Sequence, residues 1–148
     1  LWSIARHVAD GPVTNATPDG RRRGDVLSDG ISPVQGMDKS GPTALLRSVA
    51  SINHGSCRNG TLLNMRFHPS AMKTEEDRRK LAAMLRTYFA MGGMEVQLNI
   101  VSTAAMREAK REPERYRDLV VRVAGFSAYF VELHPGLQDE IIRRTELE

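Results

Sequence analysis

The chain has 148 residues, of which 41% are apolar and 26% are charged, a composition typical of a folded globular domain rather than a disordered chain. The net charge of +3 comes from cations spread among nearly as many acids, which favours a solvated surface over a nucleic-acid site. A single cysteine, Cys57, excludes an internal disulfide and favours a reducing compartment. No apolar stretch approaches the roughly 18 residues of a membrane helix, and no signal-peptide pattern opens the chain, so the cytoplasm is the expected location.

The first part of the chain, residues 1–58, is predicted to be mostly connecting structure. Turn-forming Gly, Pro, Asp and Ser are frequent from Leu1 to Gly41, where periodic apolar content is low. We expect this stretch to run as extended loops packed over something else. Pro42 suits the first turn of a short helix, and a polar, turn-like segment follows over 51–59.

The second part, residues 59–146, alternates between strand and helix patterns. The predicted elements, in chain order, are a strand over 61–67, a helix from Thr74 to Gly92, a strand over 95–101, a helix from Ser102 or Thr103 that breaks at Pro113, a strand over 120–124, a loop at Gly125 and a helix from Pro135. This order predicts an α/β fold with a largely parallel sheet. Three strands do not close a barrel, so such a sheet would be part of something larger.

Gly125 stands inside a strand-like run of Val and aromatic residues, where a glycine normally weakens the strand. In isolation, the simplest interpretation is a tight turn after a strand. The alternative is radical chemistry: if the Cα loses a hydrogen atom, the unpaired electron spreads over the flanking amide groups once they are coplanar. Glycine adopts the required backbone angles at low steric cost. The neighbouring apolar side chains would then form a wall that excludes water; they are Val121, Val123, Ala124, Phe126, Ala128 and Phe130.

The context of Gly125 decides between these alternatives. The run Arg122-Val123-Ala124-Gly125-Phe126-Ser127-Ala128-Tyr129-Phe130 and the later Gln138-Asp139-Glu140-Ile141-Ile142 and Arg143-Arg144-Thr145-Glu146 resemble the signature of the pyruvate formate-lyase-like glycyl radical enzymes. Motifs in the same order occur earlier in the chain, at residues 17–21, 28–33, 41–44 and 59–64. The likeness is greater to the diol dehydratase, decarboxylase and choline-lyase branches than to pyruvate formate-lyase itself.

This resemblance implies a fold and a function. The fold would be the C-terminal part of a ten-stranded β/α barrel, with the glycine loop and a final helix. Gly125 would store the radical, installed as a post-translational modification by a radical S-adenosylmethionine activating enzyme, with no bound cofactor. The radical would pass to a cysteine in the rest of the barrel, where a small-molecule substrate binds. The whole would be an anaerobic dehydratase, lyase or formate acetyltransferase-like enzyme.

The resemblance also bears on Arg144, Cys57 and Phe126. In the dehydratase branch, an arginine matching Arg144 lies close to the active site, where a cation holds polar substrate or developing negative charge; without the resemblance, it is a charge that meets a helix dipole. Cys57 lies at a position that the family does not use for catalysis, so we expect an ordinary thiol. Phe126 replaces the tyrosine common in the family, which removes a hydrogen-bond donor.

Several alternatives stay open at this stage. Since the chain begins without methionine, it is expected to be a fragment or a subunit, inactive without the rest of the enzyme. A stand-alone protein that repairs an oxygen-damaged enzyme, or a non-catalytic interaction domain, would also carry the motif. Residues 147–148 resemble a cloning scar and are set aside from the functional argument. The four histidines lack metal-ligand spacing, so no metal is predicted.

Overall fold

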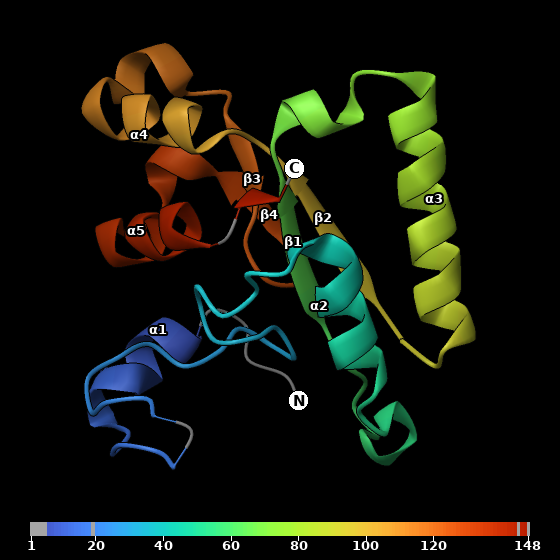
Figure 1. The fold of residues 1–148 in the computed structure, drawn as a ribbon. Coiled ribbons are helices and arrows are strands. Elements are labelled where there is room, and N and C mark those ends of the chain that lie inside the picture. The colour runs from blue at the N-terminus through green and yellow to red at the C-terminus, as the bar shows by residue number, and fades with distance from the viewer. Residues whose placement is uncertain (1–5, 19, 145, 148) are drawn as a thin grey trace.

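The computed structural model describes residues 6–18, 20–144 and 146–147 (Figure 1). Short 3₁₀ turns connect several of the elements. The α-helices of the described residues are α1 (Arg6–Asp10), α2 (Gly41–Ala50), α3 (Glu75–Ala90), α4 (Thr103–Arg111) and α5 (Pro135–Arg143). The strands are β1 (Leu63–Phe67), β2 (Val96–Ile100), β3 (Val120–Arg122), β4 (Ser127–Tyr129) and β5 (Glu146–Leu147).

The central sheet has three parallel strands in the order β2-β1-β5, as the predicted α/β pattern requires. The third strand is not the predicted one. Residues 120–122 pair antiparallel with β4 in a separate hairpin, in which Val121 faces Ala128. The chain turns back on itself between the two strands, so β3 pairs locally and leaves the edge of β1 free for β5.

Two apolar clusters hold the helices on opposite sides of the sheet (Figure 1). On one side, the odd-numbered side chains of β1 pack with α2 and α3, because successive residues of a strand face opposite ways. On the other side, α4, α5 and the β3–β4 hairpin share a second cluster that contains Met106, Phe130 and Ile141. The hairpin is therefore anchored to helices and lies against the second face of the sheet.

The ends of α3 follow from its sequence. The side chain of Thr74 accepts a hydrogen bond from the backbone N–H of Asp77, and the Asp77 carboxylate accepts one from the N–H of Thr74, which completes a capping box. After Met91, Gly92 takes a φ of 99°, a conformation that favours glycine. The predicted bounds of this helix are confirmed.

The loops before α2 pack on this chain itself. The N–H of Ile31 donates to the carbonyl of Leu62 at the start of β1, and α1 lies against α5. Gly30 approaches so closely that a Cβ there would stand 2.2 Å from the Leu62 oxygen. The segment before α2 therefore packs against β1 and α5 of the same chain, a contact that the sequence did not predict.

Leu147 also belongs to the fold. Its backbone pairs with Phe67 of β1, and its side chain is buried in the first apolar cluster. Residues 147–148 were expected to be a cloning scar without a role, yet Leu147 packs in the core. Glu148 lies outside the described residues. Within the described part of the chain, no helix combines the length and the apolar character needed to cross a bilayer.

Candidate functional site at the Gly125 hairpin

Gly125 lies in the turn of the β3–β4 hairpin. The N–H of Val123 donates to the carbonyl of Phe126 at 2.9 Å and closes the turn, and Gly125 takes a φ of 83°. A Cβ added at Gly125 would meet only Leu62 Cδ1, at 3.7 Å, an ordinary contact. Backbone conformation, rather than crowding, is what favours glycine at this position.

We expect Gly125→Ala to lower the free energy of unfolding by about 1–2 kcal/mol, because an L-residue is strained at this φ, and to leave the fold intact. Urea denaturation measures the change. Gly136→Ala is the matched control: Gly136 lies in the first turn of α5, where alanine is favourable, so no loss is expected. A Gly125→Ala chain as stable as the wild type would contradict the assigned backbone conformation.

The apolar residues around Gly125 do not enclose it in the part of the chain that the structure describes. Val121, Val123 and Ala124 are buried, but Gly125 is exposed and Phe126 is 39% exposed. Val121 and Val123 belong to the cluster shared with α4 and α5, where they anchor the hairpin. The predicted water-excluding wall is therefore absent from the described residues, and a cover over Gly125 has to come from outside them.

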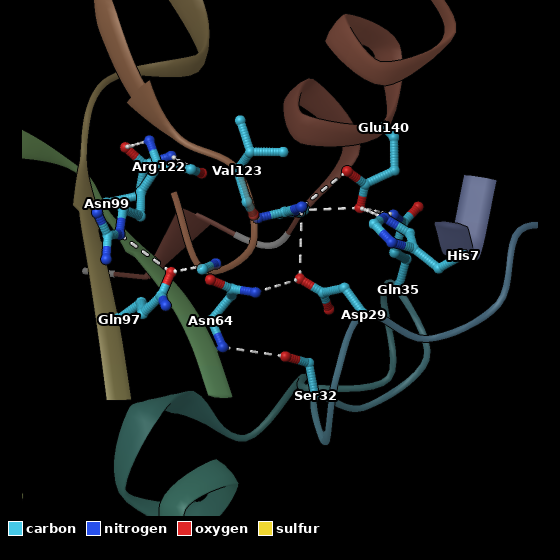
Figure 2. Close-up of polar contacts among 12 residues, drawn as sticks. His7, Asp29, Ser32, Gln35, Asn64, Gln97, Asn99, Arg122, Val123 and Glu140 are labelled. Carbon is cyan, nitrogen blue, oxygen red and sulfur yellow. Dashed lines mark hydrogen bonds and ion pairs between the residues drawn. The ribbon is translucent and has the colours of Figure 1, made fainter. Parts of the chain in front are cut away.

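Polar side chains of β2 hold the other side of the hairpin (Figure 2). The side-chain oxygen of Gln97 accepts hydrogen bonds from the N–H of Gly125 at 3.0 Å and from Nε of Arg122 at 3.1 Å. Asn99 exchanges hydrogen bonds of 3.4 Å with the backbone N–H and carbonyl of Arg122. Gln97 and Asn99 are each 8% exposed. Neither residue was predicted to belong to the site, although their alternation with the apolar residues of β2 places both on one face of the strand.

Arg144, the residue that follows α5, contacts the same hairpin. Its Nη1 donates to the carbonyl of Val123 at 2.8 Å, two residues before Gly125. The rest of the guanidinium binds Glu140, through Nε at 3.0 Å and Nη2 at 2.9 Å, and lies 3.4 Å from Asp29. Figure 2 shows Val123, Glu140 and Asp29, the three partners of this guanidinium, close together. The structure thus brings Arg144 and the Gly125 hairpin together.

Burial and charge set the protonation of this cluster. Burial alone would raise the pKa of Glu140, but His7 and Arg144 outweigh it and lower this pKa to about 2. Burial raises the pKa of Asp29, against the opposing effect of Arg144. For Arg144, burial would lower the pKa, yet the two carboxylates raise it. Glu140 and Arg144 are therefore a charged pair at neutral pH.

Further neutral and charged groups complete the cluster. Nε2 of His7 lies 3.4 Å from Glu140, and the Gln35 amide donates to Glu140 at 2.7 Å. On the other side, the Asn64 amide donates to Asp29 at 2.9 Å. A buried carboxylate is stable when such donors surround it. His7 of α1 and Asp29 and Gln35 of the following loops all precede α2, so the first part of the chain helps to support the hairpin.

The remaining candidates lie elsewhere. Cys57 follows the 3₁₀ turn His54–Ser56, between α2 and β1, and is partly buried. The ring of His54 bonds to Thr61 and to the carbonyl of Val49, whereas those of His68 and His134 cap the elements that follow them. Among the described residues, no three His, Cys, Asp or Glu side chains gather as metal ligands.

Comparison with known proteins identifies the class. The sequence profile described as "Glycine radical" matches residues 27–131, which include the hairpin. The chain belongs to the glycyl radical enzyme family. It corresponds to the C-terminal glycine-radical portion of enzymes of the dehydratase and decarboxylase type.

The relatives are much longer than this chain. Indoleacetate decarboxylase of Tractidigestivibacter scatoligenes is 49% identical over 99% of this chain and 17% of its own length. (2S)-3-Sulfopropanediol dehydratase of Klebsiella oxytoca is 44% identical over 99% of this chain and 18% of its own. The chain thus spans less than a fifth of the length of these relatives.

Solved structures give the same result for the fold. The B12-independent glycerol dehydratase of Clostridium butyricum superposes with a TM-score of 0.96 at 45% identity, over 99% of this chain and 19% of the dehydratase chain. The predicted α/β fold, an end piece of the barrel of these enzymes, is confirmed. The alternatives of a repair protein and of an interaction domain are not favoured.

Proposed function

We propose that Gly125 stores a glycyl radical for an enzyme of the dehydratase or lyase type, of which this chain supplies the radical-bearing part. The observation that carries the proposal is the position of Gly125: an exposed glycine in the turn of a hairpin whose flanking residues are anchored in a core. Its Cα–H is accessible from outside the chain, whereas the backbone on both sides is held in place. This arrangement suits the removal of a hydrogen atom and the retention of the resulting spin on Gly125 and its flanking amide groups.

The radical is installed by a radical S-adenosylmethionine activating enzyme and passed to a cysteine in the rest of the barrel. In the installing step, the Cα–H bond of Gly125 breaks homolytically, and its hydrogen atom bonds to a carbon radical that the activating enzyme generates by one-electron reduction and cleavage of S-adenosylmethionine. In the second step, Gly125 recovers a hydrogen atom from the cysteine thiol, which becomes a thiyl radical. Cys57 is the one cysteine of this chain. We assign it no catalytic role, so both partners lie outside the chain.

Substrate chemistry belongs to the assembled enzyme. The relatives are named as dehydratases, decarboxylases and a sulfite-lyase, which supports elimination or bond cleavage on a small molecule. The expected setting is the cytoplasm of an anaerobic cell, because an exposed carbon radical reacts with oxygen. We propose that Arg144 positions the hairpin through the Val123 carbonyl, since two carboxylates and that carbonyl surround its guanidinium.

Electron paramagnetic resonance tests the radical directly. The chain is incubated without oxygen with an activating enzyme, S-adenosylmethionine and a reductant. A doublet is expected in the wild type and in Gly136→Ala, and no such signal in Gly125→Ala, which retains a Cα–H but has a strained backbone. Absence of a signal from all three proteins, with a known glycyl radical enzyme activated in parallel, would contradict radical storage and favour an interaction domain.

A further inference from the structure

Gln97 links the central sheet to the candidate radical site. Its side chain rises from β2 on the face that the hairpin covers, and its oxygen accepts the N–H of Gly125 at 3.0 Å. Both hydrogen bonds to this side chain come from N–H donors, one on the Gly125 backbone and one on Arg122. Two donors require an acceptor, so the amide oxygen, and not its nitrogen, faces the hairpin.

The orientation of Gln97 is itself fixed. The Arg122 guanidinium donates through Nε to Gln97 and through Nη1 to the Ser127 hydroxyl, at 3.1 Å each. Arg122 and Ser127 are paired residues of β3 and β4. Arg122, a residue of the hairpin, therefore orients the Gln97 side chain that binds the Gly125 turn. Gln97 is only 8% exposed, which limits competition from water for these hydrogen bonds.

We propose that Gln97 is a positioning residue for the Gly125 radical: its amide oxygen fixes the N–H of the peptide group over which the unpaired electron spreads. This inference rests on the proposed function. Delocalisation requires the Gly125 N–H, Cα and carbonyl to become coplanar, whereas φ is 83° in this structure, so the backbone rotates at Gly125 when the radical forms. The hydrogen bond to Gln97 holds the N–H side of the glycine during this rotation. A neutral acceptor restrains the N–H without placing a full negative charge beside an electron-deficient centre.

Asn99 provides a matched comparison. It lies two residues along the same strand, is equally buried, and binds the same hairpin, but at the backbone of Arg122. If these side chains only tether the hairpin, replacing either one has the same effect on Gly125. If Gln97 acts on the radical peptide, its replacement alone changes the Gly125 N–H.

The first measurement is hydrogen exchange at the Gly125 amide, observed by NMR in the 148-residue chain without activation. Protection of at least tenfold over an unstructured glycine is expected in the wild type. Gln97→Met should remove that protection, Gln97→Glu should keep most of it, and Asn99→Leu should change it by less than threefold. An unprotected amide in the wild type overturns the proposal, even if Gln97→Met does not fold.

The second measurement is made on the activated radical. The hyperfine coupling of the exchangeable Gly125 amide proton, obtained by electron–nuclear double resonance in H₂O and D₂O, should shift in Gln97→Met and stay unchanged in Asn99→Leu. Equal couplings in wild type and Gln97→Met overturn the role of Gln97 while radical storage stands. If no protein forms a radical, the proposed function fails, and the amide exchange still decides whether the hydrogen bond exists.

Discussion

Arg144→Leu is expected to lower the free energy of unfolding by about 3–5 kcal/mol, the usual cost of removing one partner from a buried ion pair. Arg144 is 9% exposed and lies between Glu140 and Asp29. Without its charge, two buried carboxylates face each other, and the carbonyl of Val123 loses its donor. The hairpin that carries Gly125 should loosen together with α5.

Two variants make this test specific. Arg143→Leu changes the preceding residue, which is exposed at the end of α5, and should cost less than about 1 kcal/mol through the helix dipole. Arg144→Lys keeps the charge but lacks the fork that reaches Glu140 and Val123 together, so an intermediate loss is expected. Chemical denaturation at neutral pH measures all three. Equal losses for Arg143→Leu and Arg144→Leu would contradict the structural role of Arg144.

The stability of the chain is expected to fall as the pH is lowered from about 4.5 to about 2, because of Glu140. Its pKa is about 2 in the folded chain against an ordinary 4.5, so the folded state prefers the carboxylate. Such a group stabilises the fold fully above its unfolded pKa and loses this contribution as the pH falls through the folded pKa. At about 1.4 kcal/mol per pKa unit, the contribution is about 3 kcal/mol at neutral pH.

Asp29 acts in the opposite direction, so a variant is needed to isolate Glu140. The pKa of Asp29 is raised above 3.8, which means that its contribution declines as the pH rises. Glu140→Gln should be about 3 kcal/mol less stable than the wild type at pH 7, with the difference shrinking towards pH 2. Urea denaturation across this range gives both values. Glu114→Gln, at an exposed carboxylate, should follow the wild type. A pH-independent difference for Glu140→Gln would refute the lowered pKa.

The sequence predicted those elements whose signals are local. Thr74 and Gly92 bound α3 because capping depends on residues within one turn of the helix end. The predicted strand over 61–67 is found as β1, and its odd-numbered residues share one face because alternation is a property of the strand itself. The family resemblance then supplied the identity of the larger barrel, which three parallel strands do not reveal.

The sequence did not predict what depends on distant contacts. The polar residues of β2 alternate as on a solvent-facing strand, yet the later hairpin covers Gln97 and Asn99. β5 is too short to show any periodicity. Arg144 is paired with Asp29, and its other partner, Glu140, lies beside His7; Asp29 and His7 come from the opposite end of the chain, and no local pattern connects them to Arg144.

Isotope labelling tests the central claim most directly. If the spin resides on the Cα of Gly125, the splitting of the doublet comes from the single hydrogen left on that carbon. Anaerobically activated chain made with α-deuterated glycine should therefore lose the splitting and give a nearly single line, and Gly125→Ala should give neither spectrum. A doublet that keeps its splitting in the deuterated chain, or that persists in Gly125→Ala, would place the spin on another residue and contradict this account.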